Sequence, residues 1–131
     1  MFEKILIPTD GSELSKKAGI EAVHLAKKTG GKVIVTHIID QSLTKPYDVL
    51  ENRAKEYIQT VIDYAVENDV ECESMIIFGS PKYDIVKLTR KSEADCIMLG
   101  THGQTGLKSK LLGSFAQNVI KTIDLPIILI K

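Results

Sequence analysis

The chain has few of the residues that build disulfide frameworks, metal clusters or membrane spans. Its 131 residues contain two cysteines, four prolines, three phenylalanines and no tryptophan. Cys72 and Cys96 form neither a Cys-x-x-Cys pair nor a cluster with metal-ligand spacing, so we expect two buried, reduced thiols and no metal held by protein side chains. No apolar run approaches the roughly 20 residues that cross a bilayer, which argues against membrane insertion.

An excess of charge of one sign is also absent. Seventeen basic and seventeen acidic side chains cancel, so the chain has no net field to draw it to nucleic acid or to an anionic membrane. The first residues, Met1 to Lys4, include no charged-then-apolar leader, and we therefore expect a cytoplasmic protein. With 44% hydrophobic and 26% charged residues, residues 1–131 are predicted to form one domain that removes roughly two-thirds of its unfolded surface from water.

Several sequence signatures of nucleotide enzymes and hydrolases are missing. The sequence has no Gly-x4-Gly-Lys-[Ser/Thr] P-loop, and no Gly-x-Gly-x-x-Gly follows the first apolar run. Neither a P-loop NTPase nor a dinucleotide dehydrogenase is therefore supported. No serine lies in a Gly-x-Ser-x-Gly context, and we assign no catalytic residue from the sequence.

Apolar runs of strand length alternate along the chain with longer segments of helical period. This pattern is typical of β-α-β units and predicts an α/β fold, with a parallel sheet covered by helices on both faces. The five expected strands are residues 4–8, 32–38, 72–78, 95–99 and 127–130. The four expected helices are residues 12–29, 49–68, 81–91 and 114–123. An open sheet of this kind binds ligands beyond the carboxyl ends of its strands, where the strand order reverses.

A glycine-rich loop stands between the fourth predicted strand and the last helix. Leu99-Gly100-Thr101-His102-Gly103 follows the strand, and Gly113-Ser114 opens the helix. Glycine permits positive φ and lets backbone come close to a ligand, and we expect both at these glycines. The first N–H groups of a helix lack intrahelical acceptors and attract anions. The loop therefore predicts a phosphate site at Gly103, Gly113 and Ser114.

The loop fits in full the pattern Gly-x2-Gly-x9-Gly-[Ser/Thr], at Gly100, Gly103, Gly113 and Ser114. Together with the opening segment Lys4-Ile5-Leu6-Ile7-Pro8-Thr9-Asp10-Gly11-Ser12 and the closing segment Leu125-Pro126-Ile127-Ile128-Leu129-Ile130, it resembles the ATP-binding subgroup of the universal stress protein family over essentially the whole chain. The resemblance implies an open, doubly wound parallel sheet with strand order 3-2-1-4-5, a Rossmann-like fold similar to that of adenine nucleotide alpha hydrolases. It also implies ATP as the ligand, with Mg²⁺ or Mn²⁺ carried on the phosphates.

The same resemblance implies which residues form the nucleotide site. They are Pro8, Thr9, Asp10, Ile38, Gly100, His102, Gly103, Gly113, Ser114 and Phe115. Asp10 stands at a position that contacts the adenosine part, and the end of the second strand covers the base. Three of these residues also have purely structural interpretations: Asp10-x-x-Glu13 has capping-box spacing, Ile38 suits any buried strand, and Ser114 can simply cap the last helix.

The histidines and loop lysines have alternative interpretations as well. His24 and His37 fall on a predicted helix and strand, where hydrogen-bonded structural histidines are expected. His102 lies inside the glycine loop, where it can touch a phosphate or face solvent. Lys108 and Lys110 can neutralise phosphate charge or remain solvated.

The resemblance implies that the protein is a nucleotide-dependent switch or stress-response factor. Gln104 stands where many family members have arginine, which removes one charge that could pair with phosphate, and at most weak ATPase activity is expected. Two alternatives remain. One is a slow ATP-hydrolysing enzyme, which needs a positioned water and a charge-stabilising group. The other is a regulatory dimer that binds a protein partner and keeps a vestigial nucleotide pocket.

The last predicted strand, residues 127–130, is apolar on both faces. In the expected strand order it lies at a sheet edge, where unpaired N–H and C=O groups invite pairing with another chain. The family resemblance suggests a homodimer in which this strand pairs antiparallel with its symmetry mate.

Overall fold

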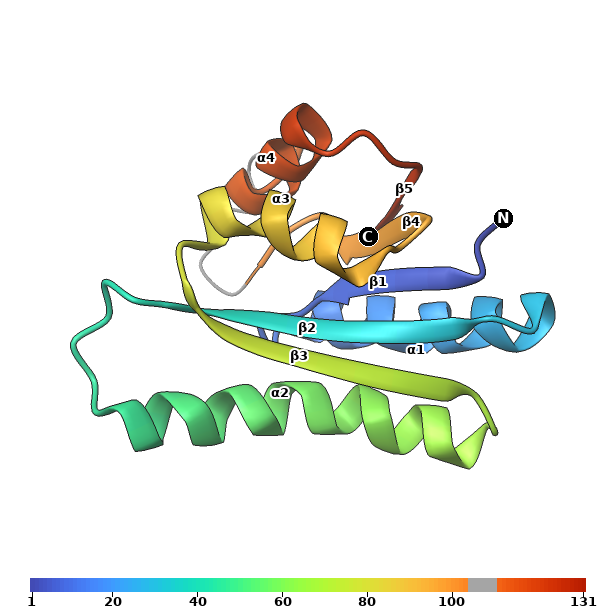
Figure 1. The fold of residues 1–131 in the computed structure, drawn as a ribbon, viewed down its shortest axis with the longest axis horizontal. Coiled ribbons are helices and arrows are strands. Elements are labelled where there is room, and N and C mark those ends of the chain that lie inside the picture. Colours follow the sequence, from blue (N-terminus) through green and yellow to red (C-terminus); the bar gives the residue numbers. More distant parts are fainter. Residues whose placement is uncertain (104–110) are drawn as a thin grey trace.

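Strands and helices alternate from one end of the chain to the other in the computed structural model, which describes residues 1–103 and 111–131 (Figure 1). The strands are β1 (Lys4–Pro8), β2 (Lys32–Asp40), β3 (Glu71–Gly79), β4 (Cys96–Gly100) and β5 (Ile127–Ile130). The helices are α1 (Glu13–Thr29), α2 (Tyr47–Glu67), α3 (Pro81–Ser92) and α4 (Ser114–Thr122). Every predicted element is present, and its ends lie within two residues of the predicted ones.

The five strands form one parallel sheet in the order β3-β2-β1-β4-β5, which confirms the predicted fold class and strand order. β1 is the central strand. It pairs with β2 from Lys4 opposite Lys32 to Pro8 opposite Thr36. On its other side it pairs with β4. The strand order therefore reverses between β1 and β4, and the carboxyl ends of these two strands diverge towards connections on opposite faces of the sheet.

Helices cover both faces of the sheet (Figure 1). Because side chains alternate along a strand, Ile5 and Ile7 pack with the residues of α1 and α2, whereas Leu6 packs with those of α3 and α4. The inner strands are near-continuous apolar runs, as expected for a sheet that is buried on both faces. Among the described helices, none is long and apolar enough to cross a membrane.

Local signals set the helix ends. α1 stops at Gly30, whose φ of 74° is left-handed and whose N–H donates to the Ala26 carbonyl. α3 begins with Pro81 in its first turn, where a missing N–H does no harm. The Asp84 carboxylate accepts a hydrogen bond of 2.7 Å from the Ser80 N–H just before this helix. These contacts hold the start of α3 beside the end of β3.

The two cysteines are free thiols in different surroundings. Cys96 is buried on β4, whereas Cys72 is half-buried on the edge strand β3. The expectation of two buried thiols is therefore right for Cys96 and wrong for Cys72, because an edge strand has one uncovered side. Burial raises the pKa of Cys72 to about 11 and that of Cys96 to about 12. Both thiols are protonated at neutral pH.

Candidate functional site

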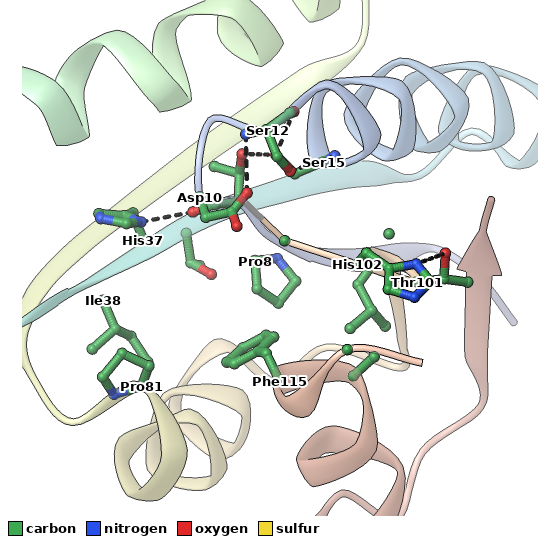
Figure 2. A pocket seen from close by; sticks show the side chains of 17 residues that line it. Pro8, Asp10, Ser12, Ser15, His37, Ile38, Pro81, Thr101, His102 and Phe115 are labelled. Atoms are coloured by element: carbon green, nitrogen blue, oxygen red, sulfur yellow. Dashed lines mark hydrogen bonds between the residues drawn. The ribbon is translucent and has the colours of Figure 1, made fainter. Parts of the chain in front are cut away.

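A cavity of about 260 Å³ opens beyond the carboxyl ends of β1 and β4 (Figure 2). It lies where the strand order reverses, the position at which open α/β sheets bind ligands. Its lining comprises Pro8, Thr9, Asp10, Ser12, Ser15, Thr36, His37, Ile38, Pro81, Leu99, Gly100, Thr101, His102, Gly103, Gly113, Phe115 and Ala116. Residues from both ends of the chain therefore meet in one hollow.

Nearly all of the predicted site residues line this cavity: Pro8, Thr9, Asp10, Ile38, Gly100, His102, Gly103, Gly113 and Phe115. Ser114 is exposed and is not part of the lining.

The cavity lining also includes residues that were not predicted from the sequence, among them Thr36, Pro81 and Ser15. Thr36 lies two residues before Ile38 on β2, so the two side chains point to the same face of the sheet. This alternation could have identified Thr36 from the sequence. Pro81 starts α3, which follows β3, the neighbour of β2, and a topological argument could have placed it near this edge of the sheet. No sequence signal identifies Ser15, whose position depends on how α1 begins.

The turn between β1 and α1 is held by its own polar side chains. The Asp10 carboxylate accepts a hydrogen bond of 3.0 Å from the Ser12 N–H, and the Ser12 hydroxyl accepts one of 3.3 Å from the Ser15 N–H. Ser12 is therefore the N-cap of α1. The structural interpretation of Asp10 as the N-cap, in a capping box with Glu13, is wrong, because the chain makes an extra turn at Gly11 before the helix starts.

Hydroxyl groups continue this network beneath the turn. The Thr9 hydroxyl donates to the Ser15 hydroxyl at 2.9 Å, and the Ser15 hydroxyl donates to the Ser12 carbonyl at 2.9 Å. The Gly11 N–H donates to the Thr9 hydroxyl at 3.3 Å. The polar wall of the cavity is thus fixed before any ligand arrives, which limits the ordering that binding would require.

His37 supports this turn from β2. Its Nδ1 lies 2.6 Å from the Thr9 carbonyl oxygen, which can only accept, so Nδ1 carries the proton. The Tyr57 ring of α2 meets the imidazole edge-on, with ring centroids 5.2 Å apart. Burial lowers the pKa of His37, and this effect outweighs the opposing influences of the Thr9 carbonyl and the Asp10 charge. The expectation of a hydrogen-bonded structural histidine is confirmed here, although this one also lines the cavity.

The lowered pKa of His37 predicts that the protein loses stability in mild acid. Below the ordinary histidine pKa of 6.5 the unfolded chain binds a proton that the folded chain resists. The contribution of His37 is complete above that pH, and the free energy of unfolding falls as the pH is lowered through the folded pKa. Urea unfolding at pH 7.5 and at pH 5.5 measures the change. In His37→Asn, which keeps a donor for the Thr9 carbonyl, this part of the slope should vanish, and an unchanged slope would contradict the assignment.

The described glycines of the loop serve close packing rather than unusual backbone angles. Gly113 has φ −69° and ψ 164°, and neither Gly100 nor Gly103 has a positive φ. The expectation of positive φ at these positions is therefore wrong. A Cβ on Gly103 would overlap the Asp10 carboxylate, and one on Gly100 would lie 2.8 Å from the Leu14 Cβ. These glycines bring the loop against α1 and the β1–α1 turn.

The start of α4 supplies the donors that the sequence predicts, with one difference. The Gly113 N–H donates to the Thr101 carbonyl at 2.7 Å, so it is not available to a ligand. The groups without an intrahelical acceptor are the N–H groups of the first turn, at Ser114, Phe115 and Ala116. No acidic residue lies in this turn, and the positive end of the helix dipole is left for an anion.

Charge around the cavity is sparse in the part of the chain that the structure describes. Asp10, His37 and His102 are the titratable residues among the lining residues, and no lysine or arginine belongs to them. Lys108 and Lys110, which the sequence suggests as partners for phosphate, lie outside the described residues, and so does Gln104. Within residues 1–103 and 111–131, no group of three or more His, Cys, Asp or Glu side chains could hold a metal ion.

A parallel doubly wound sheet with a ligand-sized hollow at its reversal point defines an α/β protein of the Rossmann-like class. The family model described as "Universal stress protein family" matches residues 1–131, and the chain belongs to this family. Universal stress protein MJ0531 of Methanocaldococcus jannaschii is 33% identical over 144 residues, an alignment that covers 100% of this chain and 83% of the relative.

Solved structures show the same fold. The structure of MJ0577, a second universal stress protein of Methanocaldococcus jannaschii, superposes with a TM-score of 0.86 at 32% identity and covers 100% of this chain and 96% of that one. The universal stress protein from Archaeoglobus fulgidus in complex with dAMP superposes with a TM-score of 0.77 at 25% identity, covering 98% of this chain and 97% of that one. The relative from Archaeoglobus fulgidus therefore binds an adenine nucleotide.

Proposed function

We propose that the chain binds ATP in the cavity between β1 and β4 and acts as a nucleotide-dependent switch or stress-response factor in the cytoplasm. One observation carries the proposal: a single cavity, where the strand order reverses, has the free N–H groups of α4 on one side and apolar side chains at its other end. The dAMP complex of the Archaeoglobus fulgidus protein supports an adenine nucleotide as the ligand class.

In this proposal, the polar and apolar ends of the cavity determine the orientation of the nucleotide. The phosphates lie against the first turn of α4 and Gly103, where donors are free and no side chain blocks approach. The base lies at the other end, where Ile38, Pro81 and Phe115 gather in Figure 2. The ribose lies between these two ends, near Asp10. The Asp10 carboxylate can accept hydrogen bonds from the ribose hydroxyls.

Mg²⁺ or Mn²⁺ would be held mainly by the phosphates. Mg²⁺ keeps several waters and commonly binds through substrate phosphates with one or two carboxylates, so a dedicated protein cage is not required. Asp10 is the carboxylate of the cavity lining. Bound in this way, the ion would neutralise phosphate charge in a site whose described lining contains no lysine or arginine.

Slow ATP hydrolysis is the second candidate function. Phosphoryl transfer depends on positioning and on charge stabilisation at the γ-phosphate. The described lining offers His102 and helix N–H groups for this purpose and no arginine or lysine, which favours a protein that retains its nucleotide over one that turns it over.

Three measurements on the purified protein test the proposal. Protein prepared without added nucleotide is denatured in acid, and the supernatant is analysed for adenine nucleotides. Calorimetry with ATP and Mg²⁺ then measures affinity, and phosphate release measures turnover. We expect saturable binding with turnover below about 1 s⁻¹, the low end of common enzyme values. Absence of both released and titratable adenine nucleotide would refute the proposed function, and faster turnover would favour an ATPase.

We also propose that two copies of the chain form a homodimer through β5. We predict that a charge in place of the exposed side chain of β5, Leu129, dissociates the dimer. β5 is an edge strand, and Leu129 is 36% exposed on it. Ile128 and Ile130 pack against the core, so Leu129→Lys tests the edge without disturbing the interior. Light scattering at micromolar concentration should give a dimer mass for the natural chain and a monomer mass for this variant.

Ile120→Lys is the matched control, because Ile120 is an exposed apolar residue on α4 and not on β5. It should leave the dimer intact. A monomeric natural chain, or a dimer that survives Leu129→Lys, would exclude the β5 interface.

A further inference from the structure

Thr36 is a buried threonine whose hydroxyl has no hydrogen-bond partner. It lies on β2, is fully buried, and lines the floor of the cavity. Its Oγ1 is the one buried side-chain polar atom of the described residues without a partner. A buried hydroxyl that loses its bonds to water without replacing them is destabilising. The position therefore calls for an explanation other than packing.

The other hydroxyl groups of the cavity have partners. Those of Thr9 and Ser15 are bonded to each other, and that of Thr101 lies 3.0 Å from His102 Nδ1. The backbone of Thr36 is used as well, since its carbonyl accepts a hydrogen bond of 2.8 Å from the Thr9 N–H. Among these hydroxyl groups, only that of Thr36 has no partner, in a residue that lines the cavity.

The surroundings of Thr36 are apolar. Side chains alternate along β2, so Thr36 shares a sheet face with Ile34 and Ile38, which belong to the core beneath α3 and α4. Across the strand pair it stands opposite Pro8, which has no N–H to offer. An isolated hydroxyl in an apolar floor suits a flat ring that presents apolar faces and a hydrogen-bonding edge.

We propose that Thr36 is a specificity-determining residue whose hydroxyl donates a hydrogen bond to a ring nitrogen of the purine base. This inference rests on the proposed nucleotide site, because the base lies at the apolar end formed by Ile38, Pro81 and Phe115. A ring nitrogen is an acceptor, and the threonine hydroxyl is a donor with no competing acceptor near it. The bond forms only in the complex, because the protein itself offers this hydroxyl no partner.

Thr36→Val separates a ligand-binding role from a structural one. Valine has nearly the same shape and removes only the hydroxyl. Without nucleotide, the variant should unfold at a temperature about 2–5 °C higher, because an unpaired buried polar group is gone. Its affinity for ATP should be about 2- to 10-fold weaker, as expected for one lost neutral hydrogen bond. A residue with a merely structural hydroxyl would lose stability and keep its affinity.

Two control variants accompany it. Thr36→Ser retains the hydroxyl and loses a methyl group, so its affinity should stay close to that of the natural chain while its stability falls. Thr89→Val removes another buried hydroxyl, one that donates to the Ile85 carbonyl at 2.7 Å outside the cavity. It should lower stability without changing affinity.

Deaza analogues of ATP identify the bonded atom. Analogues that lack N1, N3 or N7 are titrated against the natural chain and against Thr36→Val. One of them should bind the natural chain about 2- to 10-fold more weakly than ATP and show no such difference with the variant. If the natural chain binds ATP but no analogue discriminates, or only 2′-deoxy-ATP does, the base contact is refuted and the proposed function stands. If the natural chain binds no adenine nucleotide, the proposed function itself fails.

Discussion

Replacement of Gly113 by valine is expected to weaken ATP binding by about 100-fold or more, equivalent to about 2.7 kcal/mol. A Cβ at this position lies 3.3 Å from both the His102 Cα and the Thr101 carbonyl oxygen, and 3.7 Å from the Gly103 nitrogen. The two methyl groups of valine therefore fill the space between the start of α4 and the loop at Gly103. That space is where the proposed phosphates meet the free N–H groups.

Backbone strain does not contribute to this effect, because φ −69° and ψ 164° at Gly113 are open to valine. The variant should therefore fold, which circular dichroism and a thermal melt can verify before calorimetry. Gly113→Ala places only the Cβ in the tight space and should lose less affinity. Equal binding of ATP by the natural chain and Gly113→Val would show that the phosphates lie elsewhere.

The second large effect is expected at Gly11, where alanine should lower the free energy of unfolding by about 2–5 kcal/mol. Two causes add. Gly11 has φ +80°, and an L-residue in a left-handed conformation costs about 1–2 kcal/mol. In addition, a Cβ there would overlap the Tyr57 ring, and forcing extra volume into a packed site costs about 1–3 kcal/mol. Urea unfolding measures the sum.

Gly30 provides the matched control. Its φ of 74° is close to that of Gly11, but a Cβ there has nothing within 4 Å. Gly30→Ala should therefore show the backbone contribution alone, about 1–2 kcal/mol. The difference between the two variants measures the contact with Tyr57. If both variants lose the same stability, the aromatic ring moves aside freely and does not brace the turn.

The regular alternation of the chain made its fold predictable. Apolar runs such as Lys32–Ile38 are typical of strands buried on both faces, and the loop glycines and Pro81 fall at element ends. Every predicted strand and helix is present for this reason. The strand order, in contrast, came from the family resemblance, because parallel strands of similar apolar composition carry little information about which neighbour each one pairs with.

The candidate site was less predictable because it depends on contacts between distant segments. Capping-box spacing suggested Asp10 as a helix cap, but a turn at Gly11 moves the cap to Ser12. The free N–H expected at Gly113 is taken by Thr101, a loop contact that no local pattern indicates. In the sequence Thr36 is one β-branched residue within a predicted strand, and only the three-dimensional structure shows its hydroxyl without a partner.

The short pairing of β1 with β4 would give the proposed nucleotide a role in holding the sheet together. β1 matches five residues of β2 but pairs with β4 only at Ile5 and Leu6, so this is the narrow seam of the sheet. A ligand with its base near β2 and its phosphates on α4 would contact both sides of this seam. It would thereby link β4 and β5 to the part of the sheet formed by β1, β2 and β3. A ligand that binds only the folded sheet would stabilise it by RT ln(1 + [L]/Kd), where [L] is the concentration of free ligand. Nucleotide release would then loosen the seam first, and with it the edge strand β5.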